Sequence, residues 1–280
     1  MLYFLVSPGT TLGQDSILCT HIEPVVNGSF IYPAYNAKNG IVIAQQRVGS
    51  YFQLFQIDRN GGYRQFTRDS ANHVHANFSA NGKWIAFTKE SNGQRDIFLF
   101  RVETGEQVNL TNTASSNESH PAWAMDDNAI VFNTNRYDSL QEIAMITVDD
   151  RKVKRLTVNH DEDTYGSLSP DGHNLLYTKW LNEEKNPEIY VMSLQDGIEK
   201  QITNNHHRDV APVWITDSLI SFTQNGSIIL YNLTTGAQKM LVTETGFRFG
   251  RGVRVSDRSL LCERTEGRNA AGLGVLHFED

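Results

Sequence analysis

Two histidines separated by one residue are the part of this sequence best suited to chemistry. They are His73 and His75, and His120 follows later in the chain. Residues two apart in an extended strand point to the same side, so the imidazoles of His73 and His75 are expected to lie together. Imidazole nitrogens joined by a carboxylate oxygen from Glu118 or Asp163 would form a mixed ligand set that suits manganese or zinc. A metal site built on His73, His75 and His120 is therefore one hypothesis for this chain.

A repeat determines where these side chains are placed. Its clearest copy is the signature Gly166-Ser167-Leu168-Ser169-Pro170-Asp171-Gly172, a short strand followed by a turn. The signature occurs six times, and its third residue is Tyr35, Phe78, Trp123, Leu168, Trp214 and Arg254 in turn. A second marker, an apolar residue followed by threonine, closes five units at Thr67, Thr111, Thr157, Thr203 and Thr243. Repeats of about 40–50 residues that are rich in short strands are typical of β-propeller blades.

Each repeat is consistent with four short strands. In the fourth unit we expect them at 165–169, 175–178, 189–194 and 199–203, with the Ser-Pro-Asp-Gly turn after the first. No long apolar segment follows a 3.6-residue period, so few helices are expected. The sequence thus predicts one all-β domain over residues 1–280, a six-bladed β-propeller with four-stranded antiparallel blades. The expected units are 21–67, 68–111, 112–157, 158–203, 204–243, and 244–280 together with 1–20.

The last unit contains only three of its four strands, expected at 252–255, 259–264 and 273–278. The segment Ser16–Thr20 matches the strand-plus-threonine marker, and Thr20 precedes Thr67 by 67 − 20 = 47 residues, one period. Because an open blade edge is a liability, we expect this N-terminal strand to close the sixth blade. The segment Leu2–Val6 resembles a third strand, and would either compete with 273–278 or pack as an extra strand.

Composition excludes several classes of protein. A net charge of −7 and a pI near 5.7 argue against a general nucleic-acid-binding protein. No apolar segment approaches the length of a membrane span. Two cysteines, Cys19 and Cys262, make no disulfide framework, and we expect both to stay free with a strand between them. A monomer is expected, and both a cytoplasmic protein and a periplasmic one whose leader was removed remain open.

The strongest repeat copy resembles that of the TolB-type β-propellers. It runs from the Ser169–Gly172 turn through Pro187-Glu188-Ile189-Tyr190-Val191-Met192 to Gln201-Ile202-Thr203, and the resemblance covers roughly residues 16–280. Relatives include the C-terminal domain of the TolB protein, the propellers of prolyl-oligopeptidase-type peptidases, and oligogalacturonate lyases. The chain has no room for the N-terminal domain of TolB. It also has no Gly-x-Ser-x-Gly motif, so serine peptidase activity is not expected.

The resemblance also has a bearing on the histidines. A His-x-His before a first strand is similar to the metal-binding pattern of oligogalacturonate lyases. It implies manganese held by histidines and a glutamine, with an arginine as the base. Glutamine is missing from Arg68–His75, and Arg248 or Arg251 would stand in for the base.

Equivalent positions of the repeat predict where a site lies. Three residues before the third signature residue stand Tyr32, His75, His120, Tyr165, Ala211 and Arg251. Five residues before it stand Phe30, His73, Glu118, Asp163, Asp209 and Phe249. We expect both sets to form stacked rings facing the channel mouth, at the end rimmed by the loops between blades. A purely structural role, in which the acidic residues cap turns, is the alternative.

Two function classes follow from these rings. The first is a non-catalytic TolB-like binding or scaffold propeller that holds a protein, a peptide or a small polar ligand at the channel mouth. Its expected ligand-binding residues are the polar ring members and one further arginine: Tyr32, His73, His75, Glu118, His120, Asp163, Tyr165, Asp209, Arg248 and Arg251. The second is a metal-dependent lyase or hydrolase of acidic sugars that uses manganese or zinc.

Overall fold

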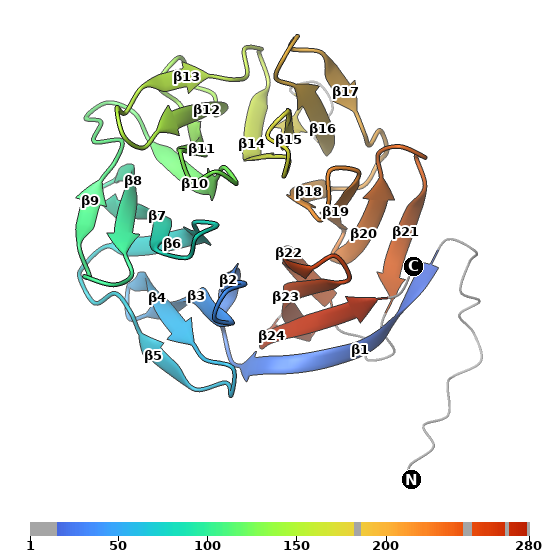
Figure 1. Ribbon diagram of the computed structural model, residues 1–280, viewed down its shortest axis with the longest axis horizontal. Coiled ribbons are helices and arrows are strands. Elements are labelled where there is room, and N and C mark those ends of the chain that lie inside the picture. Colours follow the sequence, from blue (N-terminus) through green and yellow to red (C-terminus); the bar gives the residue numbers. More distant parts are fainter. Residues whose placement is uncertain (1–15, 182–185, 243–247, 267–268, 279–280) are drawn as a thin grey trace.

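The computed structural model is a closed ring of six β-blades around a central axis (Figure 1). It describes residues 16–181, 186–242, 248–266 and 269–278, and within these ranges it contains strands β1–β24 and no helix. Each blade is a four-stranded antiparallel sheet whose strands run outward from the axis in chain order, except that the last blade takes its outer strand from β1. The predicted fold class is confirmed.

The first three blades follow each other along the chain. Blade 1 comprises β2 (Ile31–Asn36), β3 (Ile41–Val48), β4 (Tyr51–Ile57) and β5 (Tyr63–Gln65). Blade 2 comprises β6 (Asn72–Phe78), β7 (Trp84–Ser91), β8 (Gln94–Arg101) and β9 (Gln107–Asn109). Blade 3 comprises β10 (Glu118–Trp123), β11 (Ala129–Thr134), β12 (Glu142–Thr147) and β13 (Val153–Arg155).

The remaining blades complete the ring. Blade 4 comprises β14 (Glu162–Leu168), β15 (Asn174–Trp180), β16 (Pro187–Ser193) and β17 (Glu199–Gln201). Blade 5 comprises β18 (Asp209–Trp214), β19 (Leu219–Gln224), β20 (Ser227–Asn232) and β21 (Gln238–Val242). Blade 6 comprises β22 (Arg248–Ser256), β23 (Ser259–Glu266), β24 (Asn269–Phe278) and β1 (Ser16–Asn27).

The N-terminal strand closes the ring as predicted, but over a different stretch. Strand β1 pairs antiparallel with β24, mainly from Ile22 opposite Leu276 to Asn27 opposite Gly272. Residues 21–27 therefore belong to the sixth blade and not to the first, because they pair with residues 272–277 of β24. The segment Leu2–Val6 lies outside the described residues.

The start of β1 makes a second contact that the sequence did not indicate. Residues Ser16–Leu18 pair parallel with Met240–Val242 of β21, so blades 5 and 6 form one eight-stranded sheet. Only Cys19 in the segment Ser16–Thr20 pairs with the C-terminal strand. Strand β24 separates β1 from β23, as expected, and Cys262 on β23 is buried.

The threonine of the repeat fastens each outer strand to its neighbour. Its hydroxyl accepts the backbone N–H of the third strand, at Thr67 from Leu54, Thr111 from Ile97, Thr157 from Ile143 and Thr203 from Ile189. All four distances lie between 2.9 and 3.0 Å. The marker recurs because an unpaired buried N–H is costly, and valine, although of similar shape, offers no acceptor.

Candidate functional site

Every inner strand is broken by a bulge, at the same repeat position in blades 1–5 and one residue earlier in blade 6. The register shifts between Ile31 and Ala34 in blade 1, and equivalent shifts occur in β6, β10, β14, β18 and β22. Five bulge residues have a positive φ of 50–59°, namely Tyr32, His75, His120, Tyr165 and Ala211. A bulge with a left-handed residue re-aims its side chain and breaks the alternation of the strand. The expectation that residues two apart share one side therefore fails here.

The bulge residues converge on the axis, where four aromatic rings pack together. The imidazoles of His75 and His120 stack with ring centroids 3.6 Å apart. Tyr32 contacts His75 edge-on at 4.7 Å, and Tyr165 contacts His120 at 4.7 Å. The hydroxyls of Tyr32 and Tyr165 lie 3.4 Å apart and close the group. We call these four residues with Arg251 the axial cluster, and they are the ring that the sequence predicted three residues before the signature.

Neighbouring blades hold the axial cluster in place. The N–H groups of the bulge residues point at side chains on the second strand of the preceding blade. Gln45 accepts from His75 at 2.9 Å, and Glu263 accepts from Tyr32 at 2.7 Å. Burial, with the charge of Arg251, lowers the pKa of His75 to about 3. Both histidines are therefore neutral near pH 7, since burial also holds the pKa of His120 well below its usual value.

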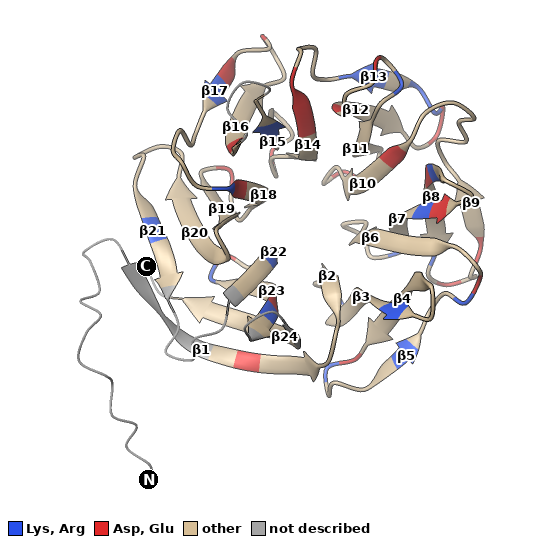
Figure 2. Ribbon diagram, turned by 180° about the vertical axis from the view of Figure 1, so that it is seen from behind, with Lys and Arg blue, Asp and Glu red and all other residues tan. Residues whose placement is uncertain are grey.

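The second predicted ring does not face the channel. Its members are buried between blades: Phe30, His73, Glu118, Asp163, Asp209 and Phe249. Figure 2 shows the acidic members as red segments of β10, β14 and β18. This ring was predicted at the mouth because strict alternation was assumed, and the bulges overturn that placement.

Instead, the polar residues of the second ring fasten the loops between blades. Glu118 accepts hydrogen bonds from Thr113 and Ser116 at 2.6 Å each, and Asp209 accepts one from Asn205 at 2.8 Å. His73 lies 3.2 Å from the carbonyl of Ala71. These contacts match the structural alternative, in which the recurring polar residues cap turns.

Asp163 gives this buried ring a pH dependence. Burial raises its pKa to about 7, above the usual 3.8, and one carboxylate oxygen has no partner. Between these pKa values the folded chain keeps a proton that the unfolded chain has released. The free energy of unfolding therefore falls as pH rises across this window, and the loss is complete above about pH 7.

Asp163→Asn should abolish this titration while keeping an oxygen for the amide of Asn159. The free energy of unfolding of the variant minus that of the wild type should be about 2 kcal/mol larger at pH 8 than at pH 5. Urea unfolding of both proteins at the two pH values measures the change. The exposed Asp149→Asn serves as the control. A difference between Asp163→Asn and wild type that is equal at both pH values would contradict the assignment.

The three histidines expected to bind metal do not converge. His73 contacts Asp69 and Phe87 in the interior of its blade, away from the axial partners of His75. Imidazole lone pairs lie in the ring plane, so the stacked rings of His75 and His120 aim them side by side and not at one point. Among the described residues, no three His, Cys, Asp or Glu side chains are grouped to hold a metal ion. The residues present do not fit the manganese site that the resemblance implied.

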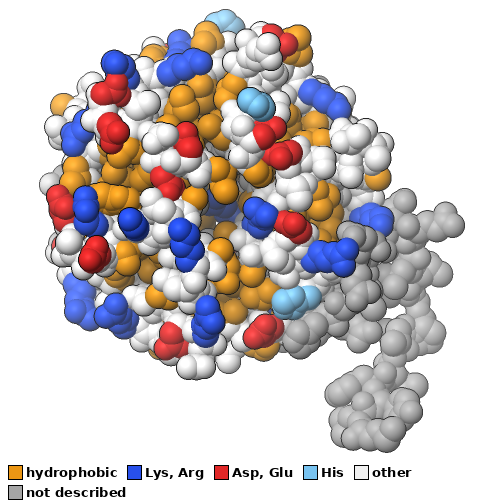
Figure 3. Space-filling model, in the orientation of Figure 1, with side chains coloured by type: hydrophobic (Ala, Val, Ile, Leu, Met, Phe, Trp, Pro, Cys, Tyr) orange, Lys and Arg blue, Asp and Glu red, His pale blue; other side chains and the backbone are white. Residues whose placement is uncertain are grey.

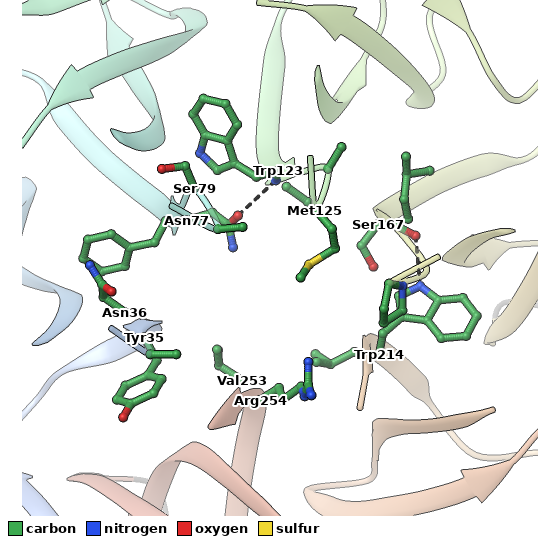
Figure 4. Close-up of a pocket in the computed structure, with 18 of the residues that line it drawn as sticks. Tyr35, Asn36, Asn77, Ser79, Trp123, Met125, Ser167, Trp214, Val253 and Arg254 are labelled. Carbon is green, nitrogen blue, oxygen red and sulfur yellow. Dashed lines mark hydrogen bonds between the residues drawn. The ribbon is translucent and has the colours of Figure 1, made fainter. Parts of the chain in front are cut away.

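A funnel of about 300 Å³ opens on the opposite face from the predicted mouth, between the hairpins that join first and second strands. Figure 3 shows this face, with apolar side chains around the central hollow. Figure 4 shows the lining, in which Trp123 and Met125 lie across the hollow from Arg254, and Trp214 lies across it from Tyr35. Its charged lining residues are Arg251 and Arg254 alone, and no Asp, Glu, His, Lys or Cys lines it among the described residues.

The rim of the funnel is held rigid by contacts between hairpins. The carboxylate of Asp127 in blade 3 accepts the N–H groups of Ala80 and Asn81 in blade 2, at 2.6 and 2.8 Å. Asp217 of blade 5 does the same for Asp171 of blade 4 at 2.9 Å. A binding surface whose shape is fixed in advance loses little conformational entropy when a ligand binds.

Sequence reasoning therefore found the axial cluster but missed the funnel. Of the predicted site residues only Arg251 lines it. The side chain of Arg248 lies outside the described residues. The missed residues belong to the signature itself, which served above only to mark the repeat. Trp123 and Trp214 are in fact core and lining at once, being 9% and 6% exposed.

Several solved structures share this architecture at low identity. TolB from Acinetobacter baumannii is 17% identical with a TM-score of 0.63, over 76% of this chain and 53% of its own. A gluconolactonase from Xanthomonas campestris is 13% identical with a TM-score of 0.68, over 91% and 88%. An oligogalacturonate lyase in complex with manganese is 12% identical with a TM-score of 0.58, over 92% and 91%. This chain spans about half the length of that TolB protein.

These similarities define the fold class of the chain but not its function. The chain is a six-bladed β-propeller that resembles TolB, a gluconolactonase and an oligogalacturonate lyase in fold. No family model matches it. Because the fold carries both binding proteins and enzymes, it does not decide between them. In the described part of the chain there is no helix long and apolar enough to cross a membrane.

Proposed function

We propose that this chain is a binding propeller that holds a peptide segment or a small ligand in the funnel and performs no chemistry on it. The observation that supports this most is the composition of the funnel wall. It combines exposed Met125 with Trp123 and Trp214, whose indoles are buried in the blade cores behind the wall, and hydrogen bonds join its hairpins. This is the apolar, largely pre-formed kind of surface that ligands bind.

Among the described residues, the wall offers no nucleophile that is paired with a base, which supports binding without catalysis. Ser79 lines the funnel, but its hydroxyl donates to Asn81 and no described base lies beside it. A nucleophile without a base within hydrogen-bonding reach stays unreactive. The alternative, a metal-dependent lyase of acidic sugars, finds no support in the placement of His73, His75 and His120. Metal analysis of the purified protein tests that alternative, because stoichiometric manganese or zinc would restore it.

Tryptophan signals offer a direct test of binding in the funnel. The chain has four tryptophans, of which Trp123 and Trp214 line the funnel while Trp84 and Trp180 do not. Displayed random heptapeptides would be selected on the protein and titrated into a sample labelled with ¹⁵N-tryptophan. We expect the indole N–H signals of Trp123 and Trp214 to move and those of the other two to stay.

A matched pair of variants locates the binding. Met125→Asp puts a charge on the apolar mouth, where side-chain exposure of 53% makes it harmless to folding, and should weaken the selected peptides about tenfold. Val158→Asp makes the same change at an exposed residue away from the funnel and should have no effect. Peptides that bind both variants equally, or a selection that yields none, would refute the proposal.

A further inference from the structure

We propose that the ligand of the funnel carries a carboxylate, which binds Arg251 at the floor while an apolar body lies against the walls. This inference rests on the proposed function, because it names the chemical class of ligand that the same funnel takes. It is supported by the position of Arg251, by its missing partner, and by the charge of the lining.

Arg251 is the one member of the axial cluster that lines the funnel. Tyr32, His75, His120 and Tyr165 fill the axis on the side of blades 1–4 with packed rings. The equivalent position in blade 5 is Ala211, whose methyl group is far smaller than those rings. The cluster is therefore least bulky next to Arg251, where the guanidinium borders the floor of the funnel.

The guanidinium of Arg251 has an unused donor. Its Nε–H is buried and has no hydrogen-bond acceptor, which is costly for a charged group. The buried carboxylate of Glu263 interacts with the charge of Arg251 but accepts the N–H of Tyr32, and no described carboxylate forms an ion pair with Arg251. Because this Nε–H is closed to solvent, a ligand carboxylate would bind the part of the Arg251 side chain that borders the funnel. A hydrogen bond from a cation to a carboxylate is among the strongest available.

The other arginine of the funnel is already neutralised. Arg254 binds the carboxylate of Asp257 at 2.6 Å and is partly exposed on the rim. No acidic residue among those described lines the funnel, and both histidines below Arg251 are neutral, so the funnel surface itself carries no negative charge against an incoming anion. The buried carboxylate of Glu263 behind Arg251 is the opposing charge that the ligand has to outweigh. The volume of about 300 Å³ suits a small carboxylic acid or the C-terminal residue of a peptide.

A pair of probes that differ only in charge tests the inference. They are 4-phenylbutanoate and its amide, each titrated into the ¹⁵N-tryptophan-labelled protein and followed through the signals of Trp123 and Trp214. We expect the carboxylate to bind at least about tenfold more tightly than the amide. A peptide ending in phenylalanine, with its C-terminus free or amidated, decides whether the same preference extends to peptides or belongs to small acids alone. If 4-phenylbutanoate binds more tightly than its amide, the inference is supported whether or not the peptides show the same preference.

Variants assign the preference to one side chain. Arg251→Gln should abolish the preference for the carboxylate over the amide, and far-ultraviolet circular dichroism shows whether the variant is folded. Arg254→Gln, the matched control in the same funnel, should keep the preference for the carboxylate. Equal binding of carboxylate and amide to the wild type overturns the inference without any variant, as does a preference that survives Arg251→Gln. Neither result touches the proposed function, which the selected peptides and Met125→Asp decide separately.

Discussion

Deletion of residues 1–27 is expected to open the ring and remove most of its stability. The change takes away β1, which pairs with β24 along its length and with the end of β21. It bares the edge of β24 and removes Val26, which is 7% exposed in the core cluster that joins blades 6 and 1. Thermal unfolding followed by circular dichroism measures the loss, which should exceed the effect of any single substitution in the ring.

A shorter deletion separates closure from mere truncation. Removal of residues 1–15 leaves every described strand in place, so this variant should unfold close to the full chain. If the protein without residues 1–27 also unfolded within a few degrees of the full chain, β1 would not be what holds the ring shut.

A methyl group added at Gly272 is expected to weaken the same pairing of β1 with β24. This residue has a φ of +125°, and a Cβ there would lie 2.0 Å from the carbonyl oxygen of Val26 and 2.9 Å from the Cα of Asn27. Both obstacles are backbone atoms of the paired strand β1, so no side chain can move aside. We expect Gly272→Ala to lower the free energy of unfolding by at least about 3 kcal/mol, as measured in urea.

Another glycine isolates the steric part of that effect. Gly172 also has a positive φ, +76°, but nothing lies within 4 Å of a Cβ built on it. Gly172→Ala should therefore cost only the backbone strain, about 1 kcal/mol. Equal losses for the two variants would show that the close approach of β1 and β24 is not the cause.

The blades could be predicted from sequence because their signals are local. The Ser169–Gly172 turn, the short β-branched strands and the closing threonine each depend on residues a few positions apart. The threonine gained its physical explanation only from the structure, where its hydroxyl accepts an N–H fourteen residues earlier in the chain, as Thr203 does from Ile189. The boundary of β1 could not be placed because its partner lies at the other end of the chain.

The prediction of the side to which each residue of the inner strands points was wrong for a different reason. Alternation predicts that His73 and His75 point the same way, but the left-handed bulge at His75 turns its side chain to the axis and leaves His73 inside the blade. No residue type at these positions announces the bulge, since tyrosine, histidine and alanine all occupy it. The funnel was missed because Trp123 and Trp214 pack in the blade cores and also belong to the residues that line the hollow.

The closing strand also has a consequence for how this protein folds. Asn27 pairs with Gly272, so the last sheet joins segments separated by almost the whole chain. During synthesis β1 emerges first and has to wait, unpaired, until β24 follows the other strands. Bringing such distant segments together costs loop entropy before any contact repays it, which makes formation of this sheet slow. The first five blades can assemble from neighbouring strands, and the seam then forms as the final and rate-limiting step.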